Sequence, residues 1–422
     1  MMVRVLQRVE GPVVEDVRAE VDRGLTALRL ERRVRSGQSV AVTAGSRGVT
    51  GSGEALRAIV SHVRRLGAEP FVVPPMGSHG GATAEGQLRV LESYGHTEAS
   101  LGCAIRSSMN VIEIARSPLG IPIWQDRAAA EADHVIVCNR VKPHTMFTGP
   151  VESGLVKMLM IGLGKEKGAS MCHRAVMDLG WPAMIDELAP VVIGNTSLLA
   201  GVALVERADE MTSRVAVLAP EQWLPEEPRL LDLARGLMPR LPFDGIDLLL
   251  LDRIGKNISG AGMDTNVIDR KQDTHPATHH PGVSVRLIGV RALSVETAGN
   301  AIGLGLAEFA RSRVLRGMDA RVTRMNALTA GDPPGAMLPV DFETDAEILD
   351  VALSMTGLRT PAQARVVWAR DTLELARTIC SVALVEDRER SAEIEVLGEP
   401  FALRFDAQGN LPDDLSEVWN AS

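Results

Sequence analysis

The sequence predicts an α/β protein with two domains, each built on a mainly parallel sheet covered by helices, and an active-site cleft between the domains. The chain has 422 residues, which is too long for one ordinary hydrophobic core. Hydrophobic residues make up 45% and charged residues 23% of the chain, as in soluble globular proteins. Strand-like and helix-like segments alternate along the chain, which is typical of a parallel sheet wound by helices.

The first half of the chain contains three predicted strands, and each of them is followed by a loop. Residues 39–45 alternate with β-branched side chains and stop at a glycine, as a strand does. After a glycine-rich loop, residues 54–67 place apolar side chains at helical spacing and end in a closing glycine. The next predicted elements are a strand, a second glycine loop, a helix with Thr83 as its N-cap and a third strand, over 69–75, 76–83, 84–95 and 132–141.

The second half of the chain continues the alternation after a connector. Residues 221–242 are rich in proline and charge, and they predict a connector with one helix. The elements predicted after it are strand, strand, helix, helix, strand and a two-stranded tail, over 246–255, 283–293, 299–318, 345–357, 364–371 and 392–414. We therefore expect an N-terminal domain of residues 1–240, on which the tail 393–422 packs back, and a C-terminal domain of residues 241–392.

Charge, cysteine content and the chain start exclude several classes of protein. The formal net charge is −9 and no basic tract occurs, so a nucleic-acid partner is not expected. The first residues carry charges throughout, which is not the pattern of a secretory signal, and no apolar run is long enough for a membrane span. The four cysteines form no CxxC pair, which argues against a disulfide framework and a thiolate zinc site. We expect a cytoplasmic protein.

Three polar side chains lie a few residues beyond predicted strands. Arg47, His79 and His144 follow the first, second and third of these strands. Ligands bind at the carboxyl ends of strands in parallel sheets, so these residues are candidates for one shared site. The guanidinium group of Arg47 can bind a carboxylate or phosphate, helped by backbone N–H groups. The glycine order in its loop is not that of a dinucleotide-binding fingerprint, and no Walker lysine follows.

A lysine in an apolar segment is the second unusual feature. Lys157 lies in "GLVKMLMIGLG", and buried lysines are rare unless they are paired or used covalently. A lowered pKa would make this amine a nucleophile, whereas the alternative is a lysine that reaches the surface from a helix. His173 follows Cys172, and neighbouring residues on a helix face different ways, so a Cys–His metal pair is not expected.

Two further loops contain polar clusters. The loop 255–270 follows the first strand of the second domain and contains Lys256, Asp264, Asn266 and Arg270 among glycines. An interdomain cleft would bring it opposite the loops of the first domain. The segment "THPATHHPG" offers His275 and His279 at metal-ligand spacing, but its prolines prevent the helix that would align them. A polar loop is the preferred interpretation of that segment.

Four motifs in order resemble those of the nickel-dependent lactate racemase family. The family has an arginine after its first strand, as Arg47 is here. Its later motifs match a histidine loop, a histidine–glycine–lysine segment and a second histidine sixteen residues after the lysine: Gly77, Ser78, His79, Thr83 and Glu85, then His144, Gly149, Gly154 and Lys157, then His173. The resemblance covers roughly residues 40–270. Gly80 stands where the family often has arginine, which predicts a roomier pocket, and Glu152 is an insertion without an assigned role.

The resemblance implies a racemase or epimerase of an α-hydroxyacid, with a sugar acid as one option, that acts by hydride transfer to and from its cofactor. The implied cofactor is a nickel-pincer nucleotide (nickel pyridinium bis-thiocarboxylate mononucleotide), tethered to Lys157, with His173 as nickel ligand. His79 and His144 would be the two general acid/bases. The cofactor-binding residues would further include Ser46, Gly48, Gly77 and Gly154, and the substrate-binding residues Arg47, Lys256, Asp264, Asn266 and Arg270. The implied partners are the hydroxyacid substrate and cofactor-biosynthesis proteins for loading, and the oligomeric state is open.

Two other functions are compatible with the same residues. Three histidines can form an open catalytic zinc site, so His79, His144 and His173 could instead serve a hydrolase with an unmodified Lys157. A non-catalytic protein that binds the nickel cofactor or a nucleotide is the third hypothesis. The metal content and the mass of Lys157 would separate these functions.

Overall fold

The computed structural model describes all residues except 46–47, 272–284, 387–393 and 421–422. The chain forms two compact units. The N-terminal unit comprises residues 11–144 and 148–238, and the C-terminal unit comprises residues 1–10, 145–147 and 239–422. Each unit contains a sheet with parallel strands and helices, so the predicted α/β class is confirmed. No helix of the described chain is long and apolar enough to cross a membrane.

The N-terminal unit is built on a sheet with the strand order β4-β3-β2-β7-β8-β9. Its strands are β2 (Ser39–Thr43), β3 (Glu69–Val73), β4 (Ala104–Ile105), β7 (His134–Arg140), β8 (Leu198–Glu206) and β9 (Thr212–Leu218). The pairs are parallel except β8 with β9, which is antiparallel. A separate antiparallel hairpin consists of β5 (Val111–Arg116) and β6 (Pro122–Asp126).

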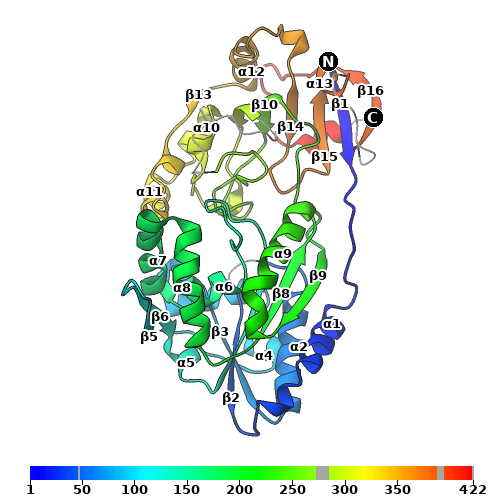
Figure 1. The fold of residues 1–422 in the computed structure, drawn as a ribbon. Helices are drawn as coiled ribbons and strands as arrows, with labels where there is room; N and C mark the ends of the chain where they lie inside the picture. The colour runs from blue at the N-terminus through cyan, green and yellow to red at the C-terminus, as the bar shows by residue number, and fades with distance from the viewer. Residues whose placement is uncertain (46–47, 272–284, 387–393, 421–422) are drawn as a thin grey trace. The chain divides into compact units, whose positions relative to one another are not determined.

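The N-terminal unit also contains helices around this sheet (Figure 1). They are α1 (Val17–Ala27), α2 (Ser52–Arg65), α3 (Ala84–Ser93), α4 (Glu98–Leu101), α5 (Arg127–Ala130), α6 (Leu155–Lys157), α7 (Lys165–Leu179), α8 (Trp181–Gly194) and α9 (Trp223–Leu237). Leu56 and Ile59 of α2 share a core with Val40 and Val42 of β2, as their helical and alternating spacing predicts. Thr83 caps α3 as predicted, because its hydroxyl accepts from the N–H of Gly86.

The strand order places a topological switch point between β2 and β7. The chain runs from β2 to β3 and β4 on one side, whereas β7 and β8 lie on the other side of β2. Loops leave such neighbouring strands in opposite directions, and a crevice forms between them at the carboxyl ends. The loop that carries His79 follows β3, and the loop that carries His144 follows β7. The two histidine loops therefore flank the loop that follows β2.

The C-terminal unit has an eight-stranded sheet within the described residues, in the order β13-β12-β11-β10-β14-β15-β1-β16. Its strands are β1 (Met2–Gln7), β10 (Ile246–Leu251), β11 (Val285–Val290), β12 (Phe309–Arg311), β13 (Val340–Phe342), β14 (Val366–Ala369), β15 (Arg377–Ser381) and β16 (Ile394–Phe401). The strands from β13 to β14 are parallel, and the last three join antiparallel. Its helices are α10 (Ser312–Arg316), α11 (Ala320–Ala330), α12 (Asp345–Ser354), α13 (Val382–Glu386) and α14 (Leu415–Trp419).

Two sequence predictions for this half are wrong. The helix predicted over 299–318 is instead the strand β12 followed by the short helix α10, because Gly299 and Gly303 adopt positive φ angles that interrupt a helix. The tail was expected on the N-terminal domain as two strands, but it contributes one strand, β16, to the sheet of the C-terminal unit. β16 pairs with β1, so both ends of the chain extend the antiparallel side of that sheet.

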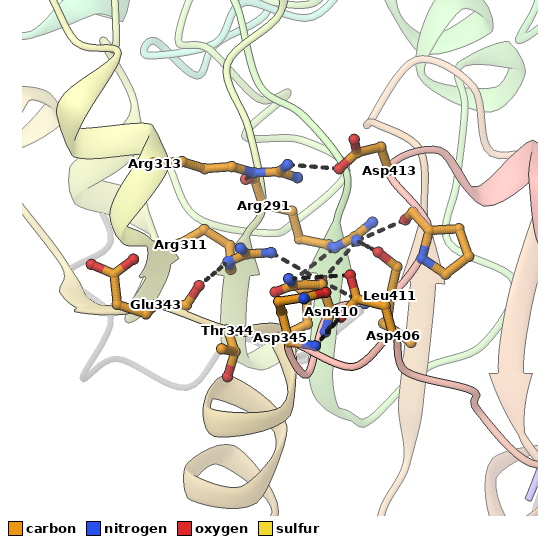
Figure 2. A network of polar contacts seen from close by, with 12 residues as sticks. Arg291, Arg311, Arg313, Glu343, Thr344, Asp345, Asp406, Asn410, Leu411 and Asp413 are labelled. Atoms are coloured by element: carbon orange, nitrogen blue, oxygen red, sulfur yellow. Dashed lines mark hydrogen bonds and ion pairs between the residues drawn. The ribbon is translucent and has the colours of Figure 1, made fainter.

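A buried ionic network closes the carboxyl end of the C-terminal sheet (Figure 2). Arg291 follows β11, is 0% exposed, and binds both Asp345 at the start of α12 and Asp252 after β10. Its guanidinium also donates to the carbonyls of Leu411 and Pro412 in the tail, at 3.0 and 2.7 Å. The paired charges and the tail therefore fill this edge of the sheet.

Candidate active site

The loop that carries His79 leaves the carboxyl end of β3 and leads into α3. The N–H of His79 donates to the carbonyl of Met76 at 2.9 Å, and the side chain is exposed. Gly80 has φ of +66°, and a Cβ there would lie 2.5 Å from backbone atoms of Gly86 and Gln87. Glycine at position 80 thus allows the loop to pack closely on α3. This packing explains Gly80 without the roomier pocket that the sequence predicted.

Lys165 is a buried cation beneath the same loop. It begins α7, is 0% exposed and has a left-handed φ of +52°. Its ammonium group lies 3.1 Å from the Asp126 carboxylate and donates to the side-chain oxygen of Gln87 at 3.0 Å and to the carbonyl of Pro74. Burial lowers the pKa of Lys165, and the charge of Asp126 opposes that shift. The lysine therefore joins α7, α3 and the end of β3 at one point.

Gln87, which accepts from Lys165, also binds the loop that carries His79. Its amide nitrogen donates to the carbonyl of Gly77 at 3.0 Å and to that of His79 at 3.4 Å. The N–H of Gly77 donates to the carbonyl of Gly162, in the segment that follows Lys157, at 3.1 Å. The predicted cofactor residue Gly77 therefore holds the His79 loop against the lysine segment. Two of the sequence-predicted motifs are in direct contact within the N-terminal unit.

Glu152, which sequence reasoning left without a role, organises the His144 loop. Its carboxylate is 1% exposed and accepts from the backbone N–H of His144 at 2.6 Å and from that of Gly149 at 3.2 Å. Arg235 of α9 pairs with it at 2.7 Å and also donates to the carbonyl of Gly149. The His144 ring is half-buried and stacks on Trp181, with 6.1 Å between the ring centres. The loop is thus closed around a buried, paired carboxylate.

Lys157 lies at the end of the helical turn α6, where the chain passes into the π-helix Met158–Gly162. π-helical turns are rare and are often found at functional sites. Gly154 precedes the turn and has no side chain to cap it. Glu227 of α9 supplies the cap, because its carboxylate accepts from the N–H of Val156 at 3.1 Å. Burial raises the pKa of Glu227 to about 7, and the hydrogen bonds from the N–H groups of Val156 and Leu155 oppose this shift.

His173 of α7 lies within electrostatic reach of Lys157. Burial lowers the pKa of His173, and the positive charge of Lys157 lowers it further. Both side chains are half-buried. A lowered pKa keeps the imidazole neutral near neutral pH, which is the form that binds a metal.

The predicted substrate residues of the loop after β10 lie in the C-terminal unit and bind within their own loop. The ammonium group of Lys256 donates to the carbonyl of Gly260 at 2.7 Å. Asp264 accepts from the backbone and side-chain N–H groups of Asn266 at 3.0 and 2.9 Å. These contacts give the loop a defined shape. Substrate binding by these three residues stays a prediction.

Arg270 has a structural use that weakens its assignment to substrate. It is buried, pairs with Glu308 at 2.8 Å and donates to three backbone carbonyls. Such a satisfied guanidinium has little left for a ligand, so we leave Arg270 out of the proposed site. Lys271 donates to the carbonyl of Phe147 at 3.4 Å. Residues 145–147, which follow His144 in the chain, belong to the C-terminal unit.

Several predicted residues lie outside the described part of the chain. They are Ser46, Arg47, His275, His279 and His280. Gly48 is exposed, and a Cβ there would lie 3.1 Å from the ring of Tyr94. The roles given to Ser46, Arg47 and Gly48 therefore stay predictions from the family resemblance.

Sequence reasoning missed the residues that hold the site in place. Glu227 and Arg235 lie in the segment 221–242, which was predicted to be a connector with one helix. The available signal was a glutamate and an arginine eight residues apart, two turns along that helix. Lys165, eight residues after Lys157, was likewise hidden in "GLGKEKG", where neighbouring lysines suggest a solvated turn.

A ready-made multi-residue metal site is not present among the described residues. No group of three or more His, Cys, Asp or Glu side chains lies close enough there to hold a metal ion. A zinc site formed by His79, His144 and His173 requires such a group. The geometry therefore gives no support to the zinc hydrolase, whereas a cofactor that brings its own donors needs one histidine from the protein.

Residues 1–180 match the lactate racemase N-terminal domain. The chain is similar to the lactate racemase apoprotein from Thermoanaerobacterium thermosaccharolyticum, with 12% identity and a TM-score of 0.53 over 85% of this chain and 96% of that chain. A Thermotoga maritima protein has 14% identity and a TM-score of 0.48, over 67% and 72%. No curated protein matches the sequence. The matched segment, residues 1–180, contains all four motifs, and the resemblance to the lactate racemase family predicted from them is confirmed.

Proposed function

We propose that the protein is a racemase or epimerase of an α-hydroxyacid, a class that includes sugar acids, and that it acts with a nickel-pincer nucleotide tethered to Lys157. The observation that carries the proposal is that the charge of Lys157 acts on the imidazole of His173, two half-buried side chains separated by sixteen residues and a π-helical turn. A covalent tether and a single nickel ligand need this pairing of an amine with a neutral imidazole. When bound, the cofactor supplies a reversible acceptor for the hydrogen of the carbinol carbon.

The residues of the chain would bind, orient and exchange the hydroxyl proton. Racemisation needs a base for each enantiomer, and histidine suits both directions near neutral pH. His79 and His144 follow β3 and β7, which lie on either side of β2 in the sheet. Each imidazole would take the proton of the substrate hydroxyl in one direction and return it in the other. Arg47, in the loop after β2, would bind the substrate carboxylate between them.

The test is to express the protein in cells that synthesise the cofactor and to measure the intact mass and the metal content. A covalent adduct on Lys157 together with nickel is the expected result. The loaded protein is then screened against hydroxyacids and aldonates in deuterated water. Epimers that keep the original hydrogen at the carbinol carbon are expected, because a hydrogen that moves to the cofactor and back does not exchange with solvent. Solvent deuterium at that carbon would instead indicate proton abstraction. Stoichiometric zinc with an unmodified Lys157 would overturn the proposal, and an adduct without any epimer would indicate a non-catalytic binder.

Two single substitutions separate the proposed roles. We expect His173→Ala to lose nickel, because the imidazole is the assigned ligand. We expect His79→Ala to retain nickel and the adduct and to lose turnover by about 10²–10⁴-fold, the usual contribution of a general acid/base. The reverse pattern would show that the two histidines have been given the wrong roles.

A further inference from the structure

Helix α9 contacts the segment between His144 and Lys157 at two places, one near each end of that segment. At the Lys157 end, the Glu227 carboxylate caps the α6 turn through the N–H of Val156. The fit is close, because a Cβ on Gly154 would lie only 2.1 Å from a carboxylate oxygen of Glu227. The extended Gly154 thus leaves the room that the carboxylate occupies.

At the His144 end, Arg235 of the same helix makes the second contact. Its guanidinium pairs with the buried carboxylate of Glu152 at 2.7 Å and donates to the carbonyl of Gly149 at 3.0 Å. Glu152 in turn accepts from the backbone N–H of His144 at 2.6 Å. Arg235 therefore reaches His144 through one carboxylate, and it neutralises a charge that would be costly to bury alone.

We propose that α9 is a positioning helix for the active site: Glu227 orients the turn that carries Lys157, and Arg235, through Glu152, orients the loop that carries His144. This inference rests on the proposed function, because Lys157 and His144, which the helix would position, are residues of the proposed active site. Neither Glu227 nor Arg235 touches the reacting atoms in this assignment. Both act through a backbone segment, and a rigid helix keeps the two segments in a fixed relation.

The chemistry around Glu227 favours positioning over stability as its role. The carboxyl group is 1% exposed, and one of its oxygens has no hydrogen-bond partner among the described residues. A buried carboxyl group without a countercharge costs stability, and an apolar side chain of similar size would avoid that cost. The benefit that it does provide is the acceptor for the turn before Lys157.

The test uses the full chain with four variants. Glu227→Leu removes the acceptor, Glu227→Gln keeps an acceptor oxygen, and Arg235→Met releases Glu152. Arg229→Met is the matched control, because Arg229 forms an exposed ion pair with Glu226 on the same helix. Amide hydrogen exchange of the apoprotein is measured first, followed by the fraction of Lys157 modified after cofactor loading and by kcat per loaded protein.

We expect Glu227→Leu to speed exchange at Val156 by about tenfold, the effect of one lost hydrogen bond. The same variant should reduce the modified fraction of Lys157 by about tenfold, and Glu227→Gln should restore it. Arg235→Met should speed exchange at His144 and Gly149 and lower kcat about tenfold, with Lys157 modification unchanged. The control Arg229→Met should match the wild type in all three measurements.

The outcomes separate the inference from the proposed function. If the wild type is loaded and Glu227→Leu is loaded equally well, the positioning role of Glu227 is wrong while the proposed function stands. Unchanged kcat in Arg235→Met would show that the positioning role of Arg235 at the His144 loop is wrong, and the proposed function would again stand. If the wild type itself acquires no adduct on Lys157, the proposed function fails and this inference fails with it. Thermal unfolding of each variant identifies any loss that comes from misfolding alone.

Discussion

The carboxyl ends of the two parallel sheets hold their polar residues in opposite ways. In the C-terminal unit, Arg291 is completely buried between Asp252 and Asp345 and also binds carbonyls of the tail. In this network the positive charges outweigh burial at Asp345. Burial alone would raise the pKa of Asp345, and the guanidinium groups of Arg291 and Arg311 hold it below its usual range.

In the N-terminal unit, the corresponding edge presents side chains that are anchored through the backbone. His79 is exposed, and His144, Lys157 and His173 are half-buried. The segments of His79, His144 and Lys157 are held by neighbouring side chains that bind backbone N–H and carbonyl groups. Buried residues that pair with one another stabilise one sheet edge, whereas the function proposed for the other edge uses residues whose segments are supported through the main chain.

The substitution with the largest expected effect on stability removes Arg291 from its buried ionic network. Arg291→Met leaves Asp252 and Asp345 buried without their shared cation, so we expect the C-terminal unit to lose about 3–5 kcal/mol of unfolding free energy. Urea unfolding followed by tryptophan fluorescence measures this loss. Trp368, one of the five tryptophans, lies in β14 of this unit and donates to Asp252 at 2.7 Å. A loss below about 1 kcal/mol, the value of an exposed pair, would show that the network is not a stability element.

The next prediction concerns the pH dependence of the N-terminal unit. The pKa of Glu227 rises from 4.5 to about 7 in the folded chain, so the folded state holds this proton more tightly than the unfolded state. The carboxyl group therefore costs stability as pH rises through this window, by about 1.4 kcal/mol for each unit of the pKa difference. Glu227→Gln does not titrate, and its stability relative to wild type should increase between pH 5 and pH 8.

Denaturant unfolding of wild type and Glu227→Gln at pH 5, 6, 7 and 8 measures this difference. Glu226→Gln, next to it on the exposed side of α9, serves as the control and should show no such trend. A constant difference across the pH range would mean that the Glu227 carboxyl group keeps an ordinary pKa. The contrast with the paired carboxylate of Asp345, whose pKa is lowered, would then disappear.

Local patterns allowed much of the fold to be predicted from the sequence. The alternation of 39–45 and the helical spacing of 54–67 correspond to β2 and α2, because each element buries one apolar face. The strand β12 was missed, since "EFAR" is too short to show a period. The tail was misplaced because pairing between β1 and β16 joins opposite ends of the chain, and no local pattern encodes such a contact.

Sequence patterns indicate some residues of the candidate site and miss others, because only local patterns can be read from a sequence. Histidines and a lysine near strand ends are visible in a sequence, because their loops have glycine and follow apolar runs. The supports of the site are not visible in this way. Glu152 and Arg235 are 83 positions apart, and Lys165 and Gln87 are 78 apart. Such pairs are set by the packing of helices on the sheet, which follows from the completed fold.

A smaller loss of stability than for Arg291 is expected at Gln87, which supports the His79 loop through its main chain. Gln87→Leu removes the bonds to Lys165 and to the carbonyls of Gly77 and His79, and we expect it to cost about 1–3 kcal/mol. Hydrogen exchange should rise locally in residues 76–82, and turnover of the loaded protein should fall more than the stability loss explains. Lost stability with full turnover would show that the His79 loop does not need this support.

The smallest effect is expected for an ion pair on the surface of the C-terminal unit. Arg316 and Glu343 pair at 2.7 Å, but both side chains are more than 60% exposed. Water and salt screen such a pair, and ordering two long side chains offsets its attraction. Arg316→Met should therefore unfold at the same urea concentration as wild type, at low and at high salt. Because Arg316 and Arg291 are both arginines beside carboxylates in one unit, a large effect at Arg316 would mean that burial does not decide which pairs stabilise this edge, and the comparison between the two sheet edges would lose its physical basis.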